Sequence, residues 1–147
     1  MADENIKDKK KTCTVYVEDW QMQCCGTPFK IGDSISWTVI EYSDSIGYRD
    51  QHCKSDFYYE NHSSAQQSEQ LYNLTATVVS IKACYYTVEY SPIEGKEKCQ
   101  MGHWIYAKSI DVTEADGRDA DIDGLQFGSY NVKLIDVSIE KIHSTGE

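Results

Sequence analysis

The stretch YNVKLIDVSI, residues 130–139, carries the pattern that most constrains the fold. Its apolar residues occupy every second position up to Leu134 and then, from Ile135 onward, take the alternate positions. A period of two is typical of a strand with one buried face, and a change of phase between neighbouring residues is what a β-bulge produces. The stretch therefore predicts a long strand that bends, as strands do at the corner of a closed sheet.

Shorter segments near the N-terminus repeat the same two-residue period. Residues 12–19, TCTVYVED, alternate apolar and polar side chains. The dipeptide Gly32-Asp33 has the composition of a tight turn, and residues 34–39 then alternate small polar with large apolar side chains. We expect two strands here, with Trp37 on the buried face of the second.

The middle of the chain predicts a hairpin. Residues 72–81 and 84–90 both read as strands, and the short connection Lys82-Ala83 between them favours antiparallel pairing. Residues 92–95, which begin with proline and end with glycine, predict a turn.

These segments together predict the fold class. About six strands, among them residues 104–110, follow at short spacing without intervening helices or an internal repeat, which favours an all-β protein. We expect a small SH3-like or OB-like barrel with at most one short helix, for which Ser64 to Gln67 supplies a capping box. One domain would span residues 12–142, after a flexible tail of mixed charge at residues 1–11.

The composition limits the classes of function. The 147 residues include 14 Lys and Arg against 24 Asp and Glu, a net charge of −10 that repels phosphate backbones and anionic lipids. No run reaches the roughly 20 apolar residues of a membrane span, and no apolar stretch follows the basic N-terminus as in a secretory signal. Six cysteines in such a chain indicate reduced thiols. We expect a cytoplasmic protein that binds neither nucleic acid nor membranes.

Two polar segments are candidates for contact with a partner. Residues 41–70 concentrate aromatic side chains, and exposed tyrosines suit recognition, although they would equally suit a lid over one barrel end. Residues 111–124 intersperse carboxylates with a single Arg118, which favours a basic protein surface or a cation. The candidate binding residues are Tyr48, Phe57, Tyr58, Tyr59, Asp116, Asp119, Asp121 and Asp123.

The adjacent pair Cys24-Cys25 is a candidate for metal chemistry. The zinc ligand set that the sequence offers is Cys24, Cys25, Cys99 and His103, with His52 and Cys53 as two further donors. The C-x-x-C spacing of structural zinc sites is missing from this set. The favoured alternative is that a cysteine of the pair is a small buried side chain enclosed by Trp20 and Phe29.

A calcium loop is half present. Asp119-x-Asp121-x-Asp123-Gly124 matches its beginning, where alternate carboxylates point at one ion. Tyr130 stands at the twelfth position, where a bidentate Glu is required, and no helices are predicted beside it. This excludes an EF-hand and leaves a weak cation site or a solvated acidic loop.

The segment VYVEDWQMQCCGTPFKIGDSISWTV, residues 15–39, resembles a known family. Small, uncharacterised bacterial proteins share a strand followed by W-Q-x-x-C-C-G-x-P-F and then G-D-x-I/V-x-W. The matching residues here are Trp20, Gln21, Cys24, Cys25, Gly26, Pro28, Phe29, Gly32, Asp33 and Trp37. The resemblance implies that this segment is one folding unit, and it implies no reaction.

No P-loop, Rossmann glycine pattern or hydrolase motif is present, which lowers the expectation of an enzyme. We therefore expect a non-enzymatic interaction module without a cofactor. It would bind a basic protein surface through its acidic and tyrosine-rich loops, as an inhibitor or immunity-type protein does. A zinc- or small-ligand-binding barrel is the second alternative and a thiol-dependent enzyme the third. The sequence does not indicate the oligomeric state.

Overall fold

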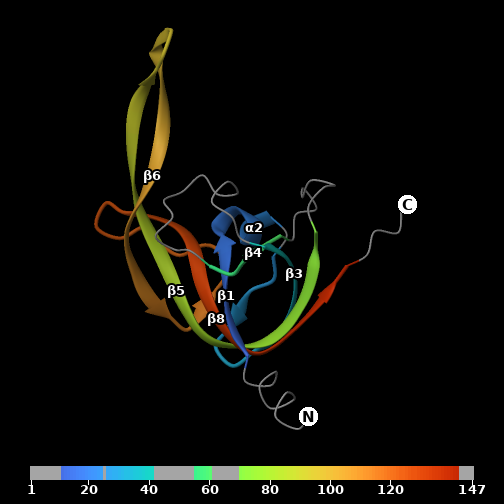
Figure 1. Ribbon diagram of the computed structural model, residues 1–147. Coiled ribbons are helices and arrows are strands. Elements are labelled where there is room, and N and C mark those ends of the chain that lie inside the picture. Colours follow the sequence, from blue (N-terminus) through green and yellow to red (C-terminus); the bar gives the residue numbers. More distant parts are fainter. Residues whose placement is uncertain (1–10, 25, 42–54, 61–69, 143–147) are drawn as a thin grey trace.

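The computed structural model describes residues 11–24, 26–41, 55–60 and 70–142 (Figure 1). Within these residues most of the chain is extended, and the one helix is short. The elements are β1 (Thr12–Glu18), α2 (Asp19–Cys24), β2 (Phe29–Lys30), β3 (Ser34–Glu41), β4 (Phe57–Tyr59), β5 (Tyr72–Ile93), β6 (Lys96–Val112), β7 (Glu114–Ala115) and β8 (Gln126–Lys141). The all-β prediction is confirmed.

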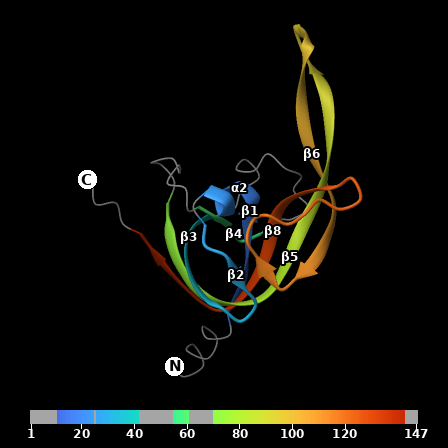
Figure 2. The same ribbon diagram turned by 180° about the vertical axis from the view of Figure 1, so that it is seen from behind.

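The main sheet has six strands in the order β3-β4-β1-β8-β5-β6, and a further pairing of β3 with β5 closes five of them into a ring. The pairing of β1 with β4 is parallel, whereas the other pairings of the ring are antiparallel. β6 lies outside the ring and pairs with β5. The ring is not an even barrel, because β5 and β8 are much longer than β4 and curve around the shorter strands (Figures 1 and 2).

The predicted bend of the last strand is confirmed. In the pairing of β5 with β8, Thr75 lies opposite Ser138 and Thr77 lies opposite Ile135, so β8 carries one extra residue there. Asp136 in this interval has a φ of 55°, a left-handed conformation that marks the bulge. The bulge moves the buried positions from one phase of β8 to the other, which lets a single strand follow the ring around its corner.

The predicted hairpin at Lys82-Ala83 is wrong, because β5 runs through it without a turn. Lys82 pairs with Asp111 on one side and Asn131 on the other, and neither Lys82 nor Ala83 favours a turn. The chain reverses instead between β5 and β6, where Gly95 has a φ of 80°, within the turn that the sequence predicted at 92–95.

Beyond the ring, β5 and β6 continue as a projecting hairpin arm, residues 87–105 (Figures 1 and 2). The pairing between β5 and β8 ends at Tyr86, opposite Gln126. Among the described residues, the strands of the arm therefore pair with each other and with no third strand. The strand predicted at 104–110 is the part of β6 that starts at the base of this arm.

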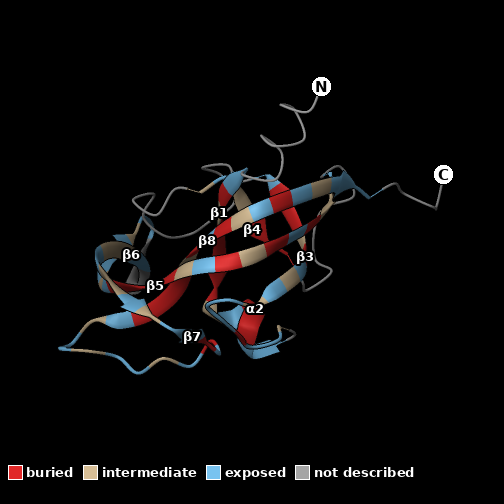
Figure 3. Cartoon of the chain, turned by 90° about the horizontal axis from the view of Figure 1, so that it is seen from below, coloured by how far each residue is buried: buried red, intermediate tan, exposed pale blue. Residues whose placement is uncertain are grey.

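The core fills the inside of the ring. Side chains from β1, β3, β5 and β8 meet there, and buried positions alternate with exposed ones along much of β5 and β8 (Figure 3). A second buried cluster lies apart from the core and contains Tyr16, Ile40, Tyr58, Cys84 and Tyr86. Strand β1 thus buries side chains in both clusters, whereas the sequence pattern suggested one buried face. None of the helices in the described part of the chain is long and apolar enough to cross a membrane.

Candidate functional site

A hollow of about 420 Å³ lies beside the small sheet of β2 and β7. In this sheet Phe29 lies opposite Ala115, and both side chains are buried. Lys30 lies opposite Glu114, and both are exposed. The two-residue period of the strands therefore gives the hollow an apolar floor and a charged rim. Its lining residues are Pro28, Phe29, Lys30, Asp33, Glu114, Ala115, Asp116 and Asp119.

The turn between β2 and β3 forms one wall of this acidic hollow. The amide of Asp33 donates to the carbonyl of Lys30 at 3.1 Å, and the amide of Lys30 donates to the Asp33 carboxylate at 3.0 Å. Gly32, with a φ of 95°, supplies the left-handed residue. The turn predicted at Gly32-Asp33 is confirmed, and its carboxylate lies at the rim.

The acidic loop, residues 116–125, forms the opposite wall and is held by buried tyrosine hydroxyls. Tyr130 is fully buried, donates to the Asp119 carboxylate at 2.6 Å and accepts from the Gly117 amide at 3.0 Å. Burial, and then the bond to Asp119, raises the pKa of Tyr130, so its hydroxyl stays protonated as a donor. Tyr85 donates to the carbonyl of Ala120 at 3.2 Å. The loop geometry is therefore set from the core.

Helix α2 locks the loop from a third direction. Gly117 has a φ of 82°, and a Cβ at this position would lie 2.4 Å from the Cβ of Met22. The side-chain amide of Gln23 donates to the Gly117 carbonyl at 2.7 Å. Only a residue without a side chain fits here, so the close contact with α2 fixes where Asp116 and Asp119 lie.

The charges of the hollow are unbalanced. The residues that line it include four acidic ones, Asp33, Glu114, Asp116 and Asp119, and one basic one, Lys30. Asp116 also accepts from the amide of Arg118 at 2.8 Å, whereas Glu114 is exposed on β7. Clefts lined by one sign of charge focus the field and attract ions of the opposite sign. The arrangement can bind a cationic side chain over its apolar floor.

A second hollow, also of about 420 Å³, adjoins the first. It lies along the start of β3 and shares Pro28, Phe29 and Asp33 with the acidic hollow. Its wall is rigid, because the Trp37 ring packs edge-on against Phe29 at 4.9 Å and against Tyr59 at 5.2 Å between ring centroids. Each hollow falls within the roughly 300–1,000 Å³ range of ligand pockets.

The predicted acidic residues divide between two places. Asp116 and Asp119 line the acidic hollow. Asp121 instead accepts from the Phe127 amide at 3.0 Å, and Asp123, with a φ of 50°, belongs to the turn closed by Ile122 and Leu125. Two carboxylates of the half calcium loop, those of Asp119 and Asp121, therefore accept from different partners, Tyr130 and the Phe127 amide.

The three aromatic residues 57–59 of the tyrosine-rich segment do not form an exposed loop. Phe57, Tyr58 and Tyr59 form strand β4, in which Tyr58 is 4% and Tyr59 is 3% exposed. Tyr58 and Tyr59 are therefore wrong as residues of a surface loop, because pairing with β1 and β3 buries them. Tyr59 contributes instead to the wall of the second hollow. Tyr48 and the helix predicted at Ser64 to Gln67 lie outside the described residues.

The cysteine segment is a helix, and this also corrects an expectation. Residues Asp19–Cys24 form α2, which ends where the Gly26 amide donates to the Gln21 carbonyl at 2.9 Å. Gln21 and Met22 point inward, while Cys24 is exposed. Enclosure by Trp20 and Phe29 is therefore wrong for Cys24, because the helical period turns it away from the core. Cys25, the other cysteine of that expectation, lies outside the described residues.

The predicted zinc ligands do not meet where the structure describes them. Cys24 ends α2, which packs against β1 and β8, whereas His103 lies on the hairpin arm and contacts Ser91 at 2.7 Å. Cys25 and His52-Cys53 lie outside the described residues, and Cys99 is described in its backbone alone. In the described ranges no three His, Cys, Asp or Glu side chains gather as a metal site.

Trp20 and Gln21 both donate hydrogen bonds to carboxylates of one polar network. The Glu18 carboxylate accepts from the Tyr58 hydroxyl and from the Trp20 indole, the latter at 3.1 Å. Gln21 donates to the Glu60 carboxylate at 3.2 Å. Burial, and then the charge of Glu18, raises the pKa of Tyr58. The network joins α2 and β4 to β1. Its residues do not line the acidic hollow, but they hold α2, which contacts the acidic loop.

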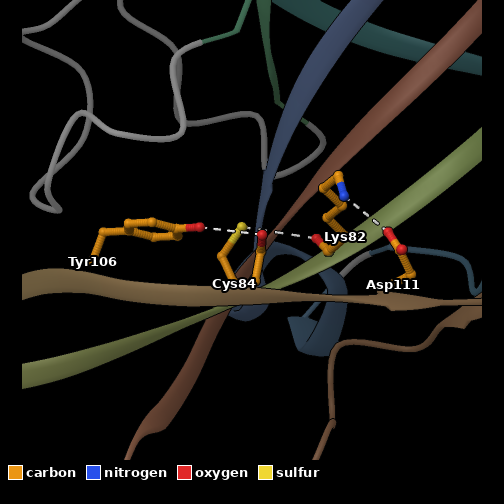
Figure 4. Close-up of polar contacts among 5 residues, drawn as sticks. Lys82, Cys84, Tyr106 and Asp111 are labelled. Carbon is orange, nitrogen blue, oxygen red and sulfur yellow. Dashed lines mark hydrogen bonds and ion pairs between the residues drawn. The ribbon is translucent and has the colours of Figure 1, made fainter.

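Two free thiols in the described part of the chain are buried, those of Cys13 and Cys84. The Cys84 thiol donates to the carbonyl of Lys82 at 3.8 Å, beside Tyr106 and the Lys82–Asp111 ion pair of 2.9 Å (Figure 4). Burial raises the pKa of the Cys13 thiol to about 11. The raised pKa keeps the Cys13 thiol protonated at neutral pH, and the thiolate, not the thiol, is the nucleophile.

Sequence reasoning missed the floor and one wall of the hollow. Lys30 was not singled out, and Glu114 was included only as part of the acidic segment 111–124. Pro28, Phe29 and Asp33 were noted for the family resemblance, for the turn or for packing, without a binding role. The available signal was the segment PFKIGD, where the buried Phe29 is followed by the exposed Lys30 and then by a turn. The pairing of β2 with β7, distant in sequence, could not be seen from it.

Fold and site define an acidic all-β protein with a ring of strands and an anionic hollow at its side. The chain belongs to a family of unknown function, DUF6578, whose family model matches residues 11–136. No curated protein and no solved structure matches the chain. The matched range covers both walls of the hollow and every element up to the bulge in β8.

Proposed function

We propose that this protein is a non-enzymatic binding module that holds a basic segment of a protein partner in its acidic hollow. The observation that carries the proposal is the arrangement of four carboxylates and one ammonium group around an apolar floor. An arginine or lysine side chain matches both parts, because its stem is apolar and its tip is cationic. The walls are held by the core and by α2, so little ordering is required on binding.

The net charge of −10 extends this preference beyond the hollow. Complementary charge accelerates encounter with a basic partner and repels acidic ones. We propose, on this ground, an inhibitor or immunity-type role in the cytoplasm, where the protein covers a basic enzyme. We also propose that the W-Q-x-x-C-C-G-x-P-F segment defines the family, because α2 and Phe29 fix the geometry of the hollow.

The test compares two variants of equal charge. Glu114 lies on the rim of the hollow, and Glu140 is exposed on β8 outside both hollows. A partner captured from cell lysate is purified and its dissociation constant measured by calorimetry at low and high salt. We expect Glu114→Gln to weaken binding by about three- to tenfold at low salt and Glu140→Gln to leave it unchanged. Equal effects of the two variants, or salt-independent binding, would refute the proposal.

The proposal includes no metal cofactor, and zinc is the specific alternative. Elemental analysis of protein purified without chelator distinguishes the two, because structural zinc binds tightly enough to survive purification. We expect well below one equivalent of zinc. A full equivalent that is lost in a Cys24→Ser variant would support the zinc alternative instead.

A further inference from the structure

Among the described residues, strand β3 is paired along most of one side and along only part of the other. Residues Ser34 to Val39 pair with β5. On the opposite side β4 pairs with Val39 to Glu41. In the part of the chain that the structure describes, no strand lies beside Ser34 to Trp37 on that second side, and there the second hollow opens. Figure 2 shows β3 from the side of β2, which runs near it.

The direction of the open backbone groups follows from two hydrogen bonds. The amide of Glu60 donates to the Thr38 carbonyl at 3.0 Å, so the main chain of Thr38 points away from β5. The carbonyl of Asp33 accepts from Val78 of β5 at 2.9 Å. Main-chain groups of alternate residues in a strand point to the same side. The amides and carbonyls of Ser34 and Ser36 therefore face the second hollow.

The two hollows form one path. They share Pro28, Phe29 and Asp33, so an extended chain lying along β3 reaches the acidic hollow at the Asp33 end of the strand. Five residues of β3, Ser34 to Thr38, correspond to roughly 16 Å of extended peptide. Exposed strand edges of this kind accept an added strand from a partner.

We propose that the partner contributes an extended segment that adds to the open edge of β3 and places an arginine or lysine in the acidic hollow. Its main chain would pair with Ser34 and Ser36, and its basic side chain would lie among Asp33, Glu114 and Asp116. This inference rests on the proposed function and specifies its binding mode. Charge complementarity selects a basic partner over a second copy, because two chains of net charge −10 repel each other.

The experiment uses the full chain and a library of fluorescent heptapeptides. Each peptide alternates threonine and valine and carries one arginine at a varied position. Anisotropy titrations identify the tightest binder, which is then resynthesised in three forms: with glutamine for arginine, with N-methyl groups on alternate amides, and with N-methyl groups on the intervening amides. The peptides carry the changes, so folding of the protein is not disturbed.

We expect arginine near one end of the peptide to give the tightest binding. One N-methylation pattern should weaken binding by about tenfold or more, because it removes the pair of hydrogen bonds to β3, and the other pattern should weaken it much less. Replacement of arginine by glutamine, or Glu114→Gln in the protein, should weaken binding several-fold, whereas Glu140→Gln should not.

Three outcomes would overturn the strand-addition mode. Binding that depends on arginine and Glu114 but tolerates both N-methylation patterns would refute it while leaving the proposed function intact. Failure of every library member to bind at millimolar concentration would refute it outright. Sedimentation that shows a dimer of the full chain, dissociated by the peptide, would make a second copy the occupant.

Discussion

The acidic loop and the hairpin arm are both excursions from the ring, and they are held in different ways. The loop has little regular pairing, yet Tyr130, Tyr85 and Gln23 bind it from the core and from α2. The arm is a two-stranded ladder with one register shift, between Pro92 and Ile93, and its described strands pair with each other alone beyond Tyr86. Hydrogen bonds from the core and from α2 thus fix the geometry of the irregular loop, whereas the arm is held by strand pairing. The wall of a binding site needs a fixed geometry of the kind that the loop has.

The largest difference between the acidic loop and the arm is expected when a glycine in each is replaced by alanine. Gly117 and Gly95 have nearly equal φ values, 82° and 80°, but only Gly117 is crowded, since a Cβ at Gly95 meets nothing within 4 Å. We expect Gly117→Ala to destabilise the fold by about 3 kcal/mol, from strain plus the clash with Met22. Gly95→Ala should cost about 1 kcal/mol from strain alone. Urea denaturation measures both, and equal costs would show that α2 does not lock the loop.

Removal of one hydroxyl tests the anchor from the core. Tyr130→Phe keeps the buried ring but leaves the Gly117 amide and the Asp119 carboxylate without this partner, so we expect a loss of about 2 kcal/mol. Hydrogen exchange should become faster in residues 116–125 and stay unchanged in the arm. Unchanged exchange in the loop would contradict the anchoring role.

The pH dependence of the free energy of unfolding tests the burial of Cys13 in the ring to which both regions are attached. The pKa of Cys13 is about 11 in the folded chain against 9.0 for a free thiol, chiefly because of burial. A raised pKa stabilises the protonated form, so its contribution is complete below pH 9 and is lost as pH rises toward 11. We expect a loss of about 1 kcal/mol over this window, allowing for solvent screening.

A Cys13→Ala variant is the control for that measurement. Its stability should be lower at neutral pH, because a buried side chain is truncated, but should decline less steeply between pH 9 and 11. If the free energy of unfolding of the variant declined as steeply between pH 9 and 11 as that of the unmodified protein, the loss would come from the tyrosines and not from Cys13.

The smallest effect is expected in the arm. Ser91 contacts His103 at 2.7 Å on its exposed surface. Ser91→Ala should change the free energy of unfolding by less than about 0.5 kcal/mol, because water replaces the lost contact. Thermal unfolding followed by circular dichroism checks this, and a loss comparable to that of Tyr130→Phe would erase the contrast between arm and loop.

Local patterns predicted several elements because their causes are local. The turn at Gly32-Asp33, the alternation of Ile35, Trp37 and Val39, and the bulge near Ile135 follow from neighbouring residues. The helix at Asp19–Cys24 was missed because six residues give too little period to recognise. The hairpin at Lys82-Ala83 was wrongly predicted because sequence reasoning split one strand of 22 residues, far longer than most.

The candidate site was predicted in part. Asp116 and Asp119 were recognised by charge, which needs no knowledge of neighbours. Tyr58 and Tyr59 were placed on the surface because their segment is polar, yet pairing with β1 and β3 buries them. Charge density is a property of the sequence, whereas exposure depends on which strands cover a residue.

The sequence by itself determined the all-β class, the bend of the last strand and the excess of negative charge. These follow from periodicity and composition, which act between near neighbours or over the whole chain. The tertiary structure decided that Lys30 lies opposite Glu114, that Gly117 meets Met22, and that no strand of the described residues pairs with the start of β3 on the side of β4. Such contacts join residues tens of positions apart, and they are fixed by how the ring closes around its core.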